Sequence, residues 1–232
     1  MQVLKLKLYQ QFANYRKPLS YNFVDTFPLP TYSHIKGWIH KILQAGDYIP
    51  ISISIQGFYE SVVYDLQTFY KFDRIRKEKE GIILSEYNKS LIKSPFYVAN
   101  LYNVSLILHI NMAYEYLKKI ETMVFDTFPA IGRYEDIARI DEINFVDIEK
   151  KETGLDFYKI RNPIYLKQET ADRYKLIGIN FRIPFKYTIK NDLRYFEKID
   201  TVYVEEGTLF GEIIIDSEGD LVELVGDYNG ED

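Results

Sequence analysis

The sequence predicts an α+β fold with a ferredoxin-like core and an antiparallel, β-rich C-terminal part. Three observations predict it: periodic segments in the order β–α–β–β–β–α–β within residues 1–150, with an excursion after the third strand, a strand-favouring aromatic content of 16%, and further alternating segments after residue 150. With 232 residues, of which 47% are hydrophobic and 27% charged, the chain can bury a sizeable core and is not disordered throughout.

Segments in which apolar and polar residues alternate predict the strands of the core. In chain order they are residues 3–10, 49–59, 62–72, 98–110 and 143–150. The alternation of isoleucine in the second of these segments is the most regular. Gly57, near its end, suits a bulge or a bend.

Two segments have the periodicity of amphipathic helices. The first covers residues 34–45, with Ser33 expected as its N-cap and Gly46 at its end. The second covers residues 112–124, with Asn111 as its N-cap. We expect both helices to cover one face of the sheet.

In three further segments the apolar residues follow neither a strand period nor a helix period. Residues 11–31 contain three prolines and are predicted to be a long loop, and residues 126–139 a loop and turn. Residues 73–95 are charged and irregular, which indicates an excursion from the core in the form of a protruding hairpin. Long loops in compact domains are usually functional or disordered.

Residues 151–232 are predicted to form a β-rich subdomain packed on the first domain, residues 1–150, because no linker rich in Pro, Gly or Ser separates them. A tight turn is expected at Glu218–Gly219, between the last two strands. The expected strands lie within residues 165–169, 176–183, 195–206, 209–216 and 221–227.

The net charge of −5 conceals two halves of opposite sign. Residues 1–119 hold 15 basic and 9 acidic residues, whereas residues 120–232 hold 14 basic and 25 acidic residues. Ten of these acidic residues, and no basic residue, lie in residues 205–232. This asymmetry predicts an anion-binding front, and an acidic end that faces outward, contacts a basic protein partner or only aids solubility.

The composition excludes several classes of protein. Without cysteine there can be no disulfide, Cys-ligated metal or cysteine nucleophile, and three histidines argue against a His-rich metal site. We therefore expect no metal and no cofactor. There is no run of 18 apolar residues, and the first ten residues alternate, so we expect no membrane association and a cytoplasmic location.

Catalytic motifs such as G-x-S-x-G, H-E-x-x-H and Walker loops are absent. His34 and His40 are six residues apart and do not share a helix face. His109 lies between apolar residues of a strand, which places it in the core or at a subunit contact. The adjacent Glu135 and Asp136 are expected to form a turn or cap rather than an acid–base pair.

The loop before the first helix and the start of that helix combine basic, aromatic and small residues. A helix N-terminus offers free N–H groups to a phosphate, and a glycine in the first turns lets a ligand approach the backbone. Basic and aromatic residues in this pattern suit single-stranded RNA. The residues concerned are Tyr15, Arg16, Lys17, Ser33, Lys36 and Gly37.

Two motifs in the first part of the chain are specific when taken together. The first is A-N-Y-R-K-P at residues 13–18, followed by T-F-P-L-P at 26–30 and S-H-I-K-G-W at 33–38, and the second is I-G-R-Y-E-D at 131–136. The first resembles the N-terminal signature of the Cas-five family of CRISPR-associated proteins, and the second resembles that family's L-G-R-x-E-D segment. The resemblance spans residues 1–145, and the short chain and long basic excursion look most like the type I-B branch.

This family belongs to the RAMP superfamily, so the resemblance implies a ferredoxin-like RAMP domain. It further implies a non-catalytic subunit of a type I Cascade interference complex, which caps the backbone filament and holds the 5′ handle of the CRISPR RNA. The partners would be that RNA, the backbone subunit and the large subunit. Target DNA would be reached only through the complex, because guide pairing reads the target.

The resemblance also implies a thumb hairpin, at about residues 71–95 here, that contacts the neighbouring subunit or the guide. The alternative is an ordinary surface loop. In the second motif, Arg133 would contact the handle, or would pair with Glu135 or Asp136 and only fix the turn. The thumb bases are Arg74, Arg76, Lys77 and Lys79.

Two other functions stay open at this point. One branch of the family, type I-C, is an endoribonuclease that cuts precursor CRISPR RNA and uses Tyr, Lys and His, with Lys next to His. This chain has no Lys-His dipeptide, and its nearest candidates for a metal-independent ribonuclease are His34, Lys36 and His40. The other possibility is a ferredoxin-like protein that binds a small ligand or only assembles with partners.

Overall fold

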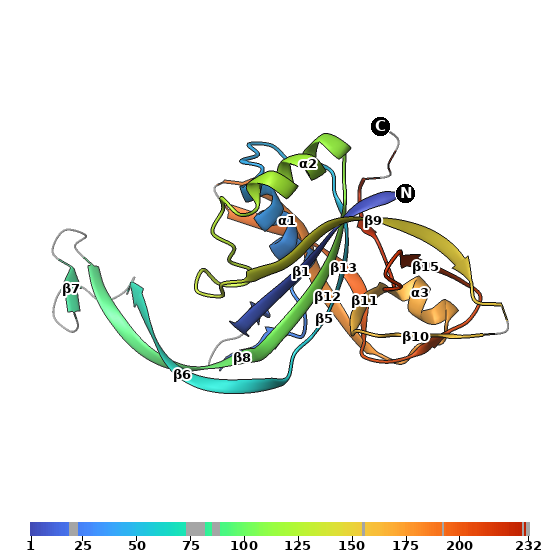
Figure 1. Cartoon of the computed structure of the whole chain (residues 1–232). Coiled ribbons are helices and arrows are strands. Elements are labelled where there is room, and N and C mark those ends of the chain that lie inside the picture. Colours follow the sequence, from blue (N-terminus) through green and yellow to red (C-terminus); the bar gives the residue numbers. More distant parts are fainter. Residues whose placement is uncertain are drawn as a thin grey trace.

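The computed structural model describes residues 1–18, 23–72, 82–84, 89–154, 156–191, 193–228 and 230. Its central sheet has the strand order β5-β8-β1-β9, and each neighbouring pair is antiparallel (Figure 1). One helix follows β1 and another follows β8, which is the ferredoxin-like arrangement predicted from the sequence. These strands are β1 (Gln2–Ala13), β5 (Ser52–Phe58), β8 (Lys89–Asn111) and β9 (Arg139–Glu152).

The two helices, α1 (Tyr32–Ile42) and α2 (Tyr114–Met123), pack on one face of this sheet. Alternate residues of β1 point to that face and meet one side of each helix. Burying each large aliphatic side chain contributes about 1.5–3 kcal/mol, so this layer is the main source of stability. Its members include Leu4, Leu6, Leu8, Ile35, Ile39, Leu117 and Ile120. No helix in the described part of the chain is long and apolar enough to cross a membrane.

The ends of α1 differ from the prediction. Its N-cap is Thr31 and not Ser33, and the Thr31 N–H donates to Nδ1 of His34 at 3.3 Å. The helix stops before Gly46, because Gln44 already takes the left-handed conformation at φ 51°. A glycine would be the usual residue there, which is why the sequence pattern pointed to Gly46.

Two further local predictions were wrong. Asn111 does not cap α2, whose N-cap is Ala113, because Asn111 is the last residue of β8 and pairs with Ser52. Gly57 makes no bulge, since the register between β5 and β8 is continuous. It allows a close approach instead: a Cβ at Gly57 would lie 2.4 Å from the carbonyl oxygen of Ser105.

The segment 11–31, predicted as a loop, contains the end of β1 and three short strands. β2 (Tyr15–Arg16) pairs with β4 (Thr26–Phe27), and β3 (Phe23–Val24) runs parallel to β8. Pro28 directly follows β4 and, having no N–H to donate, helps to end it. The prolines therefore limit the length of these strands without preventing them.

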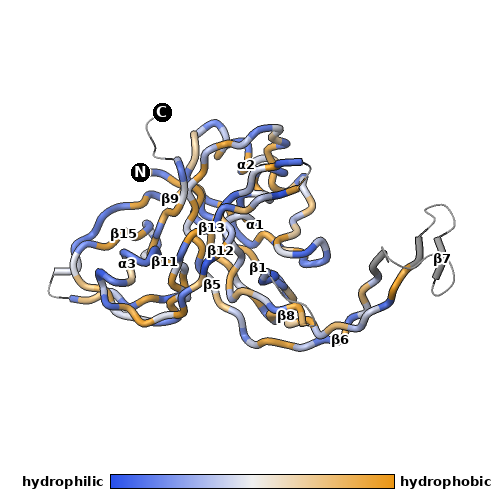
Figure 2. The backbone as a smooth tube through the Cα atoms, turned by 180° about the vertical axis from the view of Figure 1, so that it is seen from behind, coloured by the Kyte–Doolittle hydropathy of each residue, from blue (hydrophilic) through white to orange (hydrophobic). Residues whose placement is uncertain are grey.

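The excursion predicted at 73–95 belongs to a longer hairpin. β6 (Ser61–Phe72) pairs with β8 from Ser61–Tyr102 to Phe72–Leu91, and β7 (Ile82–Leu84) pairs with the start of β8. Figures 1 and 2 show this hairpin curving away from the body. The predicted thumb bases Arg74, Arg76, Lys77 and Lys79 lie outside the described residues.

The C-terminal strands extend the core sheet at both edges. Next to β5 the order continues through β11 and β13 to β12, while β15 pairs with β9. Position 150, the predicted boundary between residues 1–150 and 151–232, lies inside β9, and the division into two domains stays a prediction. These elements are β10 (Tyr158–Lys159), β11 (Ile164–Lys167), α3 (Gln168–Arg173), β12 (Ile179–Lys190), β13 (Leu193–Val204), β14 (Thr208–Leu209), β15 (Glu212–Asp216) and β16 (Val225–Gly226).

Two predictions for this part were wrong. The strand expected at 165–169 gives way to helix α3 after Lys167. The strand expected at 221–227 is reduced to β16, which pairs with β5, and only an isolated bridge joins this segment to β15. The tight turn itself is present, and Gly219 adopts φ 86° and donates its N–H to the Asp216 carbonyl at 2.9 Å.

Candidate nucleic-acid interface

The structure brings the two sequence motifs together beside the start of α1. The backbone N–H of Asn14 donates to the Asp136 carboxylate at 3.0 Å, and the Gln10 amide donates to the carbonyls of Ile131 and Asp136, both at 2.9 Å. Gly132 takes φ 112°, and a Cβ there would lie 2.6 Å from Oδ2 of Asp136. Only glycine suits this position, so the glycine of the second motif has a structural cause.

Arg133 forms ion pairs within its own turn. Its guanidinium lies 2.7 Å from the Asp136 carboxylate and 3.1 Å from that of Glu135, and Nη2 donates to Oδ1 of Asn100 at 3.0 Å. The side chain is 18% exposed. Of the two roles considered from the sequence, these contacts match the fixing of the turn, and they leave little of the guanidinium for RNA.

Three residues of the first motif that were predicted to bind RNA, Tyr15, Arg16 and Lys17, differ in solvent exposure. Tyr15 is fully buried, and its hydroxyl donates to Oε1 of Gln10 at 2.6 Å. Burial raises the pKa of the Tyr15 hydroxyl, and its ring is not available to stack on a base unless the core opens. Arg16 is exposed, whereas Lys17 pairs with Asp25 at 2.8 Å. Arg16 and Lys17 therefore remain as surface cations.

The N-terminus of α1 is not an open phosphate site. Thr31 and Tyr32, which begin the helix, are fully buried. A phosphate could not reach the free N–H groups of the first turn without displacing them. The sequence pattern identified the helix, but it did not show that the core covers the helix end.

The predicted residues Ser33, Lys36 and Gly37 line one cavity of about 360 Å³ along the side of α1. A Cβ added at Gly37 would meet nothing within 4 Å, so this glycine leaves the wall open as expected. The loop after α1 and strand β12 form the other walls. Their lining residues, with one more from α1, are His40, Ala45, Gly46, Asp47, Tyr48, Lys186, Tyr187 and Ile189.

Lys36 lies beneath this cavity, with its side chain only 4% exposed. Its Nζ donates to the Tyr48 hydroxyl at 2.9 Å, lies 3.7 Å from the Asp227 carboxylate and sits 3.5 Å from the centre of the Phe185 ring. Burial lowers the pKa of Lys36 to about 8, although Asp227 opposes the shift. The amine is thus mostly charged at pH 7 and loses its charge just above that pH.

The charges around the cavity are of both signs. Lys186 pairs with Asp227 at 3.4 Å and with Glu197 at 3.7 Å, and Asp47 also lines the wall, so two lysines are accompanied by three carboxylates. The walls add aromatic rings, including His40 stacked on Tyr48 at 5.3 Å. Donors, acceptors and planar rings together match the edge and faces of a nucleobase better than they match a bare phosphate.

Both histidines of the ribonuclease alternative are engaged in local structure. Nδ1 of His40 donates to the Lys36 carbonyl at 2.7 Å, and Nε2 accepts the N–H of Ile49 at 2.9 Å, so both ring nitrogens are used. Nδ1 of His34 accepts the N–H of Thr31, and burial lowers the pKa of His34 to about 4. In this arrangement neither imidazole is placed as a free general acid or base near Lys36.

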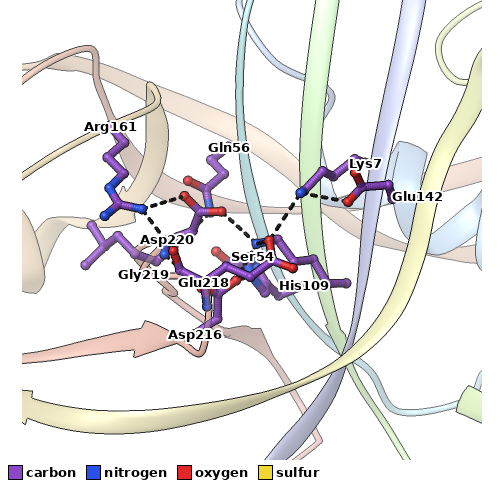
Figure 3. Close-up of polar contacts among 12 residues, drawn as sticks. Lys7, Ser54, Gln56, His109, Glu142, Arg161, Asp216, Glu218, Gly219 and Asp220 are labelled. Atoms are coloured by element: carbon purple, nitrogen blue, oxygen red, sulfur yellow. Dashed lines mark hydrogen bonds and ion pairs between the residues drawn. The ribbon is translucent and has the colours of Figure 1, made fainter.

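The opposite face of the sheet, which RNA-recognition-type domains offer to RNA, is closed at one end by a charged cluster. Nζ of Lys5 lies 2.6 Å from Asp216, 2.7 Å from Glu218 and 2.7 Å from Asp220. Figure 3 shows these three acidic residues gathered beside His109. His109, buried as expected, places Nε2 2.9 Å from Asp216. The Lys5 ammonium fills the space between the three carboxylates, where a metal ion would otherwise fit.

This cluster corrects the prediction for residues 205–232. Asp216 and Asp220 were expected on the outer surface or against a partner, but both are buried. Sequence reasoning missed the reason, because the lysine that neutralises them lies 211 positions away from Asp216. The acidic end is therefore partly a structural element of this chain.

Sequence reasoning also missed the contribution of β12 to the cavity. A signal was present, since a basic residue occurs at every fourth position through β12 and β13. These residues are Arg182, Lys186, Lys190, Arg194 and Lys198. Such a spacing does not show by itself which face is exposed, because the register shifts between Pro184 and Lys186.

Comparison with known proteins gives structural neighbours. No protein-family model matches the sequence, and no curated protein matches it. A chain of a CRISPR RNA-guided surveillance complex superposes with a TM-score of 0.56 over 90% of this chain and 91% of that chain, at 11% identity. A CRISPR protein from Archaeoglobus fulgidus superposes with a TM-score of 0.50 over 99% of this chain and 100% of that chain, at 9% identity. The chain therefore has the fold of CRISPR-associated proteins.

Proposed function

We propose that the protein is a non-catalytic CRISPR RNA-binding subunit of a type I Cascade interference complex, most similar to the Cas-five subunit of the type I-B branch. In this role it holds the 5′ handle of the guide in the cytoplasm and caps the backbone filament. The observation that carries the proposal is the cavity beside α1, because three of the residues expected from the sequence, Ser33, Lys36 and Gly37, line it together. The fold shared with a chain of an RNA-guided complex supports the same assignment.

The cavity would take one unpaired base of the handle. Lys36 and Ser33 would offer donors to the edge of that base, and Tyr48 would offer its ring to the face. The Tyr48 hydroxyl is engaged, because it donates to the Asp227 carboxylate at 2.7 Å and accepts from Lys36. The phosphates on either side would meet one cation of the cavity wall, Lys186, and one outside the cavity, Lys17. Lys17 lies 5.6 Å from the ring of Phe181 at the start of β12, and Lys186 lies about five residues, or roughly 16 Å, further along that strand.

The hairpin of β6 and β8 supports the proposal of subunit contacts. Several large apolar side chains on it are exposed, among them Tyr64, Leu66, Tyr70 and Tyr97, at 57% or more. A protruding two-stranded ribbon is marginally stable alone and gains stability from a neighbour. We assign this neighbour to the backbone subunit, with the large subunit and target DNA reached through the assembled complex.

The proposal is tested by measuring the affinity and integrity of a labelled repeat RNA with the purified full chain, with and without EDTA. We expect salt-sensitive binding of intact RNA, at least tenfold weaker for Lys36→Met. Lys151→Met is the matched control, because Lys151 is exposed on β9 far along the chain from the cavity residues. Equal affinities of wild type and Lys36→Met would refute the role of the cavity.

The same assay separates the two alternatives. A discrete cut that persists in EDTA, and is lost in His34→Ala or His40→Ala, would identify a metal-independent ribonuclease acting on precursor CRISPR RNA. Absence of binding, both alone and with the backbone subunit, would favour a ferredoxin-like protein that binds a small ligand or only assembles. The hydrogen bonds that engage His34 and His40 favour the non-catalytic role.

A further inference from the structure

The end of the hairpin formed by β12 and β13 is unusually exposed. The described residues of 187–198, on both strands, are all exposed to solvent. A two-stranded ribbon with both faces in water is stabilised by few contacts. We call this part of the hairpin the β12–β13 ribbon. It begins at the cavity, because Tyr187 and Ile189 also line the cavity wall.

One face of the ribbon carries aromatic rings and a guanidinium. Tyr187 is paired with Phe196 across the strands, and Ile189 with Arg194, so all four side chains share a face. The rings of Tyr187 and Phe196 are 5.7 Å apart, and the Arg194 guanidinium lies 4.8 Å from the centre of the Tyr187 ring. Tyr187 and Phe196 are 38% and 46% exposed, so their rings are accessible.

The ribbon carries a net positive charge in an acidic protein. Residues 187–198 hold three basic residues against Asp192 and Glu197, whereas the whole chain has a net charge of −5. Within the described part of the chain, Lys190, Arg194 and Lys198 form no ion pair with a carboxylate. These cations are therefore available to an anionic ligand.

We propose that this face of the ribbon is a second RNA-contact surface, on which unpaired bases adjacent to the one in the cavity stack. The inference rests on the proposed function, since it extends the path of the same RNA. Tyr187 and Phe196 would supply the stacking surfaces, while Arg194 and Lys198, which flank Phe196 on the same face of β13, neutralise phosphates. A protein partner fits less well, because the centre of a protein interface is depleted of lysine, and here Lys198 lies beside Phe196 on the face of the rings.

The test compares variants of the full chain on the two faces of the ribbon. Tyr195 is the matched control, because it is 52% exposed and lies on the opposite face, paired with Thr188. We expect Tyr187→Ala with Phe196→Ala to weaken binding of a single-stranded repeat RNA about tenfold or more, and Tyr195→Ala to change it less than about twofold. Urea unfolding of each variant verifies that the fold is retained.

A second readout locates the contact directly. Repeat RNA carrying 4-thiouridine should form photo-crosslinks to the peptide that contains residues 187–196. Equal affinities of the double variant, the Tyr195→Ala control and wild type, with crosslinks elsewhere, would overturn the inference while leaving the role of the cavity intact. Loss of binding to another subunit without any change in RNA affinity would reassign the face to protein contact and overturn it too. If wild type binds no repeat RNA even with the backbone subunit, the proposed function itself fails.

Discussion

Replacing Lys5 by methionine would leave a buried cluster of carboxylates without its central cation. Asp216 is fully buried, and Lys5 is its nearest cation at 2.6 Å. Removing one partner of a buried ion pair costs about 3–5 kcal/mol, because the remaining charge is left uncompensated. Since whole domains are stable by about 5–15 kcal/mol, we expect a fall in Tm of roughly 6–20 °C for a chain of this size.

The pH dependence of this loss of stability shows whether the missing ion pairs of Lys5 cause it. Burial tends to lower the pKa of Lys5, but hydrogen bonds to Asp216, Asp220 and Glu218 outweigh it and raise that pKa above 10.5. Burial tends to raise the pKa of Asp216, but hydrogen bonds from His109 and Lys5 hold it below 3.8. The stabilisation from Lys5 is therefore complete below pH 10.5 and is lost as the pH rises further. The stabilisation from Asp216 is complete above pH 3.8 and is lost as the pH falls further.

The measurement is urea unfolding of wild type and Lys5→Met between pH 4 and pH 9. We expect the difference in unfolding free energy to be largest near pH 7 and to shrink toward pH 4, where protonation relieves the uncompensated carboxylates. Lys7→Met is the control, because Lys7 is 33% exposed and pairs with Glu142 and Glu218, and it should cost less than about 1 kcal/mol. Equal costs for the two variants, or a difference independent of pH, would refute the reasoning.

Three further predictions concern the motifs and the cavity. Gly132→Ala should lower the unfolding free energy by about 1–3 kcal/mol in urea titrations, because φ is 112° and the new Cβ meets the Asp136 carboxylate. An unchanged midpoint of the urea unfolding curve would contradict this prediction. Gly37→Ala should instead raise stability by about 0.5–1 kcal/mol, since the position is helical and open, and thermal unfolding that shows a loss would be the contrary result. Because the pKa of Lys36 is about 8, the affinity of wild type for repeat RNA should fall as the pH rises from 7 to 9 at constant salt. Lys36→Met should bind weakly, and its affinity should depend little on pH. Parallel pH profiles of the two proteins would exclude Lys36 as the titrating group.

The core strands and helices were predictable because their signals are local. Alternation in β1, β5 and β9 and the helical period of α1 and α2 depend only on neighbouring residues. The helix caps lie at other residues than predicted, because pairing with distant segments decides where an element ends. Asn111, for example, is held in the sheet as the last residue of β8. Helix α3 was missed because six residues are too few to show a period.

The candidate site was predictable only where one element carries it. Ser33, Lys36 and Gly37 lie on one helix, so their proximity follows from the spacing along α1. The aromatic residues could not be sorted in this way, because composition does not distinguish buried Tyr15 from exposed Tyr187. The wall supplied by β12 depends on a contact between segments about 150 residues apart, which no local pattern records.

The charged cluster also makes the first strand depend on the last turn during synthesis. Lys5 precedes Asp216 by 211 residues, so at about 5–20 residues per second its partner follows it by roughly 10–40 s. If the sheet closed earlier, the Lys5 ammonium would be buried with no carboxylate beside it. The free-energy cost of burying this unpaired charge keeps that face open to water. The sheet can therefore close on this side only after the turn at residues 216–220 has been made, which links closure of the sheet to synthesis of that turn.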